Sequence, residues 1–134
     1  FDGRPLLEVF LEPTRIYVKP IFKLMESVPI KAMAHITGGG LTENIPRVLA
    51  EHLTAELDSA SWPRPKLFQW LQQEGNVAEP EMYRTFNCGI GFVLVLSAEN
   101  ASQAIELLKE QGEEVYKIGK VRLRETAQAQ TIIK

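Results

Sequence analysis

The sequence contains little of what disulfide-rich, metal-binding and membrane proteins need. Its single cysteine, Cys88, excludes an internal disulfide framework and a cysteine-based zinc cage, and is consistent with a reducing compartment. Its two histidines, His35 and His52, are too few for a metal site without carboxylates. Its longest apolar stretches, such as residues 90–96, fall far short of the roughly 20 residues of a membrane helix. We therefore expect a cytoplasmic protein with no metal site and no membrane partner.

An excess of charge of either sign is also absent. The 134 residues include 15 basic and 17 acidic side chains, which gives a formal net charge of −2. Nucleic-acid and anionic-membrane surfaces are usually strongly basic, so neither partner is expected and any anion site must be local. Apolar residues make up 45% of the chain and charged residues 24%, which is ordinary for a globular protein. The length fits one domain.

Helix and strand patterns alternate early in the chain, and strand patterns cluster late. Residues 1–12 mix turn formers with a short apolar run and are predicted to be an incoming arm, followed by one domain over residues 13–134. Predicted helices cover residues 18–25, 41–49, 65–74, 80–83 (one turn) and 101–108. Predicted strands cover residues 31–36, 54–57, 88–96, 115–118, 121–123 and 130–133. This order favours an α+β or α/β layered domain whose helices cover a mixed sheet.

Three consecutive glycines lie between a predicted strand and a predicted helix, in the segment AHITGGGLTENIPR over residues 34–47. Converging backbone N–H groups with the positive end of a helix behind them suit a phosphate or carboxylate, and Arg47 adds a charged fork. The alternative is a tight turn whose glycines only permit positive φ. Thr37 is predicted to cap the helix, and Asn44 to face the same cavity. The segment is neither a dinucleotide fingerprint, because Glu43 stands at a glycine position, nor a P-loop.

A second polar cluster precedes the strongest apolar run, in the segment MYRTFNCGIG over residues 82–91. Arg84, Thr85 and Asn87 are candidates to line a cleft at the mouth of a strand that is predicted to be buried on both faces. The alternative is a bulged strand start with Asn87 in a turn.

His35 and Cys88 carry the reactive side chains of these two segments. His35 lies beside the glycines and is a candidate for ligand binding or proton transfer. The alternative is a core histidine with satisfied hydrogen bonds. Cys88 has no base near it in sequence, so we expect a buried, inert thiol.

Taken together, these segments resemble the phosphoribosylformylglycinamidine cyclo-ligase family, the aminoimidazole ribonucleotide synthetases of purine biosynthesis. The order and spacing match as well as the residues, and the similarity runs from about residue 11 to residue 121. Ala50 is a departure, since proline is expected after Arg-Val-Leu. The motifs that carry the resemblance are EPTRIYVK (12–19), AHITGGGL (34–41), ENIPRVL (43–49), FQWLQ (68–72), MYRTFNCG (82–89) and KIG (117–119).

The resemblance implies the carboxy-terminal domain of a two-domain enzyme, an α+β fold with α/β/α layers, a mixed sheet and a partly ferredoxin-like topology. The implied reaction is ATP-dependent ring closure. The formyl oxygen of formylglycinamidine ribonucleotide is phosphorylated, an amidine nitrogen attacks that carbon, and phosphate leaves. ATP and magnesium are implied to bind mainly to an amino-terminal domain that this chain does not contain and that also forms most of a homodimer contact.

The resemblance also implies site residues, by position in the motifs. His35 is the candidate catalytic residue. The isolated domain is expected to be inactive alone, and the alternative function is a non-catalytic module of the same fold that binds a phosphorylated metabolite. The implied substrate- or phosphate-binding residues are Thr37, Gly38, Gly39, Gly40, Asn44, Arg47, Arg84, Thr85 and Asn87.

Overall fold

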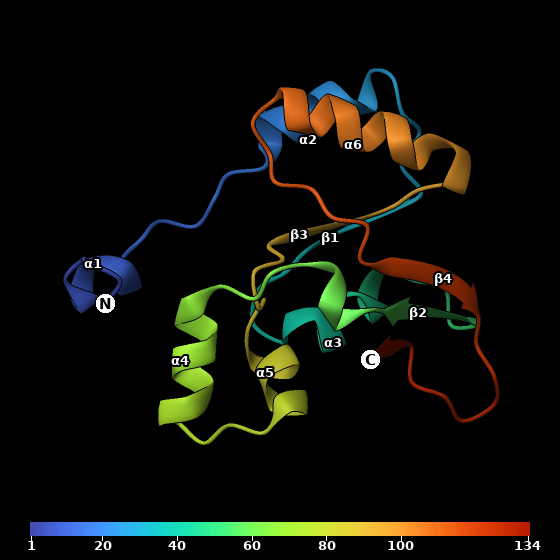
Figure 1. Ribbon diagram of the computed structural model, residues 1–134. Coiled ribbons are helices and arrows are strands. Elements are labelled where there is room, and N and C mark those ends of the chain that lie inside the picture. Colours follow the sequence, from blue (N-terminus) through green and yellow to red (C-terminus); the bar gives the residue numbers. More distant parts are fainter.

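The computed structural model describes residues 1–134 and shows short helices arranged around two small sheets (Figure 1). The helices are α1 (Leu6–Phe10), α2 (Val18–Met25), α3 (Gly40–Asn44), α4 (Lys66–Glu74), α5 (Glu79–Thr85) and α6 (Ala101–Glu110). The strands are β1 (Ala32–His35), β2 (Leu53–Leu57), β3 (Phe92–Val95), β4 (Gly119–Leu123) and β5 (Thr131–Ile133). Single turns of 3₁₀ helix cover Pro46–Val48, Ser59–Ser61 and Ala98–Asn100.

The two sheets have different pairing. Strands β1 and β3 form an antiparallel pair. In the other sheet the central strand β2 has antiparallel β4 on one side and parallel β5 on the other. The predicted α+β class with a mixed sheet is therefore confirmed, and the strand order β4-β2-β5 comes from the structure alone.

Strand β3 separates two hydrophobic cores. Val93 packs against the larger core, which α3, α5 and the three-stranded sheet share, whereas Leu94 packs against the core between α2 and α6. Figure 1 shows α2 and α6 side by side beyond one face of β1 and β3, with α3, α4 and α5 beyond the other. Alternate residues of β3 thus face different layers, although all four residues of the strand are only half-buried.

Proline and glycine move several element boundaries away from the predicted ones. The helix predicted over residues 41–49 ends at Asn44, because Pro46 lacks the N–H that would continue the helical ladder. The strand predicted over residues 88–96 begins only at Phe92. Cys88 and Gly89 have φ values of 50° and 99°, so the chain turns there instead of extending.

The strand predicted over residues 115–118 is absent, because this β-branched segment has no strand beside it to pair with. The other predicted elements are confirmed to within about two residues, apart from α5, which is longer than the single turn expected. No helix in the structure has both the length and the apolar character needed to cross a bilayer.

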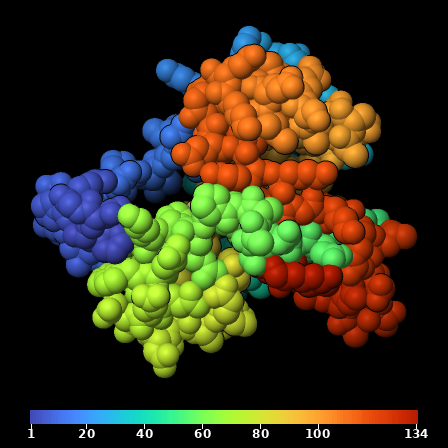
Figure 2. All heavy atoms as spheres, viewed as in Figure 1, coloured from blue at the N-terminus to red at the C-terminus, as the bar shows by residue number.

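Residues 1–12 carry α1 and lie against α4. The rings of Phe1 and Phe10 lie 5.9 Å and 6.3 Å from the ring of Trp70. In Figure 2 this segment protrudes beside α4, and none of its residues belongs to either core. Arg15 then fixes the segment that leads into α2, donating to both carboxylate oxygens of Glu113 at 2.8 Å and 3.0 Å. The division into an arm and a domain remains a prediction.

The largely buried guanidinium of Arg64 links the loop that precedes α4 to helix α5. Arg64 donates from Nη1 to Gln72 Oε1 at 2.7 Å and to Glu79 Oε2 at 3.0 Å, and from Nη2 to Glu79 and to the Tyr83 hydroxyl. The hydrogen bond from Arg64 lowers the pKa of the Glu79 carboxyl to about 2. The network ties the two helices of one edge together.

Because the pKa of Glu79 is lower in the folded chain than in the unfolded chain, its contribution to stability is present above about pH 4.5 and is lost as the pH falls toward 2. Glu79 is half exposed, so we expect a contribution on the order of 1 kcal/mol. Urea unfolding of wild type and Glu79→Gln at pH 2.5 and pH 7 checks this prediction. The difference between the two proteins should be smaller at the acidic pH, and an unchanged difference would contradict it.

Candidate functional site

The three glycines of the loop after β1 are held in different ways. Gly40 has φ 55°, and a Cβ atom there would lie 2.1 Å from the Tyr83 carbonyl oxygen and 2.6 Å from that of Phe86. Gly39 has φ 100° and forms the N-cap of α3. Gly38 has ordinary φ, and a Cβ atom there would meet nothing within 4 Å. Turn geometry and packing thus explain two of the glycines, whereas the third borders open space.

Asn44 supports the loop from beneath. It is only 5% exposed, and its Nδ2 donates to the carbonyl oxygens of Gly40 at 2.8 Å and of Thr37 and Gly38 at 3.3 Å each. Its Oδ1 accepts from Arg47 Nη1 at 3.1 Å. Asn44 therefore does not face a cavity as predicted, because its whole amide is used inside the protein. It acts as a positioning residue for the loop.

The loop also keeps free donors. The backbone N–H groups of Gly38 and Gly39 donate to no other group of the chain. The prediction that Thr37 caps the helix is wrong: Gly39 is the N-cap, and Thr37 contributes its carbonyl oxygen, which accepts from the Gly40 N–H at 2.9 Å. Two free N–H donors beside open space are what an anion-binding loop requires.

Charges of both signs surround the loop. Arg47 is exposed and forms no ion pair, so most of its guanidinium remains free. Glu43 reaches over Gly39, its Oε2 2.9 Å from where a Cβ of that glycine would lie. Arg84 lies 3.9 Å from Glu43 but is held by Glu81 at 2.6 Å. Arg47 is therefore the more available cation for an anion at the loop.

The structure gives less direct support for Thr85 and Asn87 as binding residues. Thr85 ends α5 and is exposed, and its side chain forms no hydrogen bond with the rest of the chain. Asn87 Oδ1 accepts from the Gly89 N–H at 3.0 Å, which closes a turn. Gly89 packs on Pro65, whose Cδ lies 2.7 Å from the position of a Cβ. The alternative of a turn at Asn87 is therefore what the structure shows, and its role in binding remains a prediction.

His35 is exposed, so it is not a core histidine. Its ring lies 6.0 Å from that of Phe92 in a stacked orientation and 5.9 Å from that of Tyr17. Tyr17 also approaches Gly91, where a Cβ atom would lie 2.1 Å from the tyrosine hydroxyl oxygen. Tyr17 and Glu43 are the two neighbours of the site that residue patterns did not select, although both lie inside the motifs quoted above. A catalytic role for His35 remains a prediction.

Cys88 is fully buried, as predicted. Its Sγ donates to the Met82 carbonyl oxygen at 3.4 Å, and burial raises the pKa of the thiol to about 11. The structure brings no three histidine, cysteine, aspartate or glutamate side chains together in a way that could hold a metal ion.

A hollow lies at one end of the three-stranded sheet, and no residue of the glycine loop lines it. One lining carboxylate, Glu56, accepts from Lys134 and from Arg122, the latter at 2.8 Å, and these two bonds lower the pKa of Glu56 to about 2. Only one of its eight lining residues, Leu57, is hydrophobic. Its lining residues are Glu56, Leu57, Asp58, Ser61, Lys117, Gly119, Lys120 and Lys134.

Comparison with known proteins gives consistent matches. Residues 1–130 match the family described as "AIR synthase related protein, C-terminal domain". A phosphoribosylformylglycinamidine cyclo-ligase from Chromobacterium violaceum is 61% identical over 134 residues, covering 99% of this chain and 39% of the relative. Cyclo-ligases of the same name from Methylobacillus flagellatus and Burkholderia mallei are 55% and 57% identical over 133 residues, covering 38% of each relative. The chain thus spans about two fifths of the length of these relatives.

Proposed function

We propose that this chain, which belongs to the AIR synthase related protein C-terminal domain family, is the carboxy-terminal domain of a phosphoribosylformylglycinamidine cyclo-ligase. The observation that carries the proposal is the 61% identity to a cyclo-ligase across nearly the whole chain. For the whole protein we propose the ATP-dependent closure of formylglycinamidine ribonucleotide to aminoimidazole ribonucleotide, with ADP and phosphate as the other products. We further propose that the whole protein is a cytoplasmic homodimer.

Within that reaction, we assign to this chain the binding of a substrate phosphate at the glycine loop. The N–H groups of Gly38 and Gly39 are free to donate to phosphate oxygens, and Arg47 adds a charge that no carboxylate neutralises. Asn44 keeps these donors in place before the substrate arrives, so that binding needs little reorganisation of the loop. Arg84 stands nearby as a second cation, partly neutralised by Glu81.

ATP and magnesium belong mainly to the rest of the whole protein in this proposal. Magnesium prefers carboxylate and other oxygen ligands, and this chain gathers no cluster of acidic side chains around the loop. The residues present therefore do not fit a magnesium site.

A chimeric enzyme tests the proposed function. The part of the Chromobacterium violaceum cyclo-ligase that matches this chain, 39% of its length, would be replaced by these 134 residues. We expect the chimera to form aminoimidazole ribonucleotide from formylglycinamidine ribonucleotide and magnesium ATP, whereas the isolated chain should not. A folded chimera that binds the ribonucleotide without turnover would contradict the proposal and support the non-catalytic binding module.

Replacement of Arg47 tests the phosphate contact. Arg47→Ala in the chimera should raise the KM for the ribonucleotide about tenfold, because one charge-assisted contact of about 1.4 kcal/mol is lost. The matched control is Arg124→Ala, which removes another exposed arginine that forms no ion pair, directly after β4. Steady-state kinetics of both variants decide the question, and equal KM values would remove Arg47 from the site.

A further inference from the structure

Helix α2 carries a wide apolar stripe, only part of which has a partner. Ile21 and Leu24 face inward, Leu24 in the core shared with α6. Val18, Phe22 and Met25 follow one another at helical spacing on the outer face, and all three are exposed, Phe22 to 66%. The apolar stripe of a surface helix normally packs against another element. The outer face of α2 therefore lacks the partner that its composition predicts.

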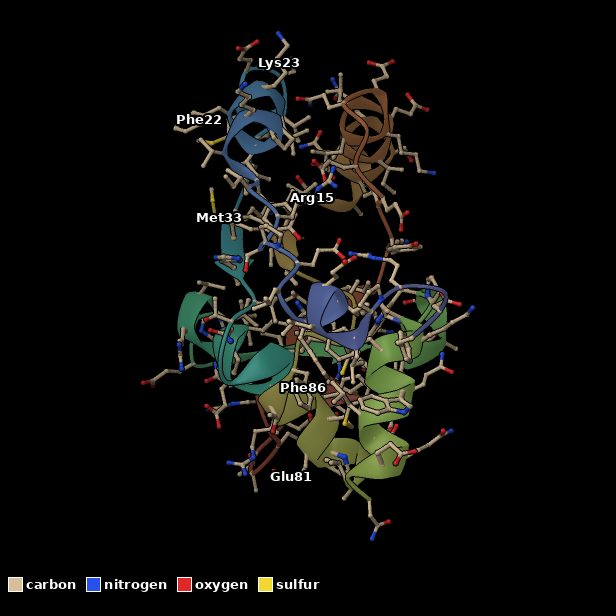
Figure 3. The ribbon with its side chains drawn as sticks, turned by 90° about the vertical axis from the view of Figure 1, so that its left-hand side faces the viewer. Arg15, Phe22, Lys23, Met33, Glu81 and Phe86 are labelled. Atoms are coloured by element: carbon tan, nitrogen blue, oxygen red, sulfur yellow. The ribbon has the colours of Figure 1, made fainter.

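The exposed apolar surface extends beyond α2 in both directions along the chain. Ile16, in the segment before the helix, is 79% exposed, and Met33 projects from the outer face of β1. Figure 3 shows the side chains of Phe22 and Met33 on the same side of the molecule. We name this surface the α2 patch and define it by Ile16, Val18, Phe22, Met25 and Met33. Exposed apolar patches of this kind mark interaction sites.

The α2 patch continues into the glycine loop through β1. Met33, His35 and Thr37 are exposed, whereas the intervening Ala34 and Ile36 are buried. Alternate residues of an extended chain share one face, so the outer face of β1 leads from the patch to the loop. Whatever covers the patch therefore also lies close to the loop.

We propose that the α2 patch docks the remainder of the full-length protein, and that this contact places the glycine loop against that remainder. The related cyclo-ligases extend beyond the matched region by about three fifths of their length, so a covering domain of the same polypeptide is at hand. The docking surface of that domain is apolar, with a carboxylate at its rim opposite Lys19, which is exposed beside the patch and forms no ion pair. The inference rests on family membership and not on the proposed reaction.

Methionine oxidation tests the docking directly. The chain has three methionines: Met25 and Met33 in the patch are 50% and 36% exposed, and Met82 in the core is 0% exposed. Dilute hydrogen peroxide should oxidise Met25 and Met33 in the isolated chain and do so about tenfold more slowly in the chimera described above. Met82 should resist in both proteins, which shows that each is folded. Equal oxidation rates at Met25 in the two folded proteins would overturn the proposal.

A substitution in the patch supplies a second measurement. Phe22→Asp in the chimera should restore fast oxidation of Met33, because a charge on the outer face of α2 opposes docking. The control Leu123→Asp places the same charge at another exposed apolar residue, on β4, and should leave Met33 protected.

Two other results of these experiments would separate the docking proposal from a second copy of this chain and from the proposed function. Protection of Met25 in the isolated chain that disappears on dilution would assign the patch to a second copy of this chain, and so overturn the proposal. A chimera with protected methionines but no turnover would contradict the proposed function and leave the docking proposal standing.

Discussion

Replacing Gly40 with alanine should destabilise the chain by about 3 kcal/mol or more. The new Cβ atom would lie 2.1 Å from the Tyr83 carbonyl oxygen and 2.6 Å from that of Phe86, and both are backbone atoms that no rotamer change can move. The residue also has φ 55°, which costs an alanine an additional 1–2 kcal/mol, approximately. Helices α3 and α5 must therefore separate, and urea unfolding of the isolated chain measures the loss.

Gly38→Ala is the matched control for this prediction. A Cβ atom at Gly38 meets nothing within 4 Å, so its free energy of unfolding should stay within about 0.5 kcal/mol of wild type. In the chimera the same substitution places a methyl group beside the free N–H groups and should raise the KM for the ribonucleotide. If Gly40→Ala were as stable as Gly38→Ala, the contact between α3 and α5 would not be as described.

This difference between neighbouring glycines shows how far the sequence could predict the site. The run of three glycines predicted a loop that either binds an anion or merely turns, and local patterns could not separate the two. The answer depends on Tyr83 and Phe86, which lie more than 40 residues away in sequence. Packing between distant segments made one glycine structural and left another facing open space.

The fold was predictable to a similar degree. Helices α2, α4 and α6 carry their own periodicity, and each was predicted within about two residues. Strands depend on neighbours: residues 115–118 have strand composition but no partner, whereas residues 119–123 pair with β2. The positive φ values of Cys88 and Gly89, which shorten β3, serve the packing of Gly89 on Pro65. Local composition carries no information about that contact.

The spacing of residues in the sequence also could not predict the role of Asn44. An asparagine one turn into a helix after a glycine loop fits a ligand contact as well as it fits a support. The structure distinguishes these roles because three carbonyl oxygens lie within 3.3 Å of its Nδ2. The same three contacts make Asn44 the most sensitive polar side chain of the loop.

Asn44→Asp should lower the free energy of unfolding by about 3 kcal/mol at pH 7, because it leaves a buried charge and removes a donor that the loop needs. The substitution keeps the shape of the side chain but puts a carboxylate oxygen where Nδ2 now donates to Gly40 at 2.8 Å. The Oδ1 partner Arg47 offsets only part of the cost, because it contacts the other oxygen. Asn100→Asp is the control, since the Asn100 amide donates only to the Ser97 hydroxyl.

The pH dependence of this penalty shows whether it arises from the charge of the new carboxylate. Burial and the neighbouring carbonyls raise the pKa of an aspartate at position 44 above its unfolded value of about 3.9. The penalty should therefore be complete well above that raised pKa and shrink as the pH falls through it, because a protonated carboxyl can donate to the Gly40 carbonyl again. Urea unfolding of wild type and variant at pH 3 and pH 7 measures the difference. A penalty of equal size at both pH values would mean that it does not arise from the charge of the carboxylate, and no penalty at either pH would mean that the Asn44 amide does not hold the loop carbonyls.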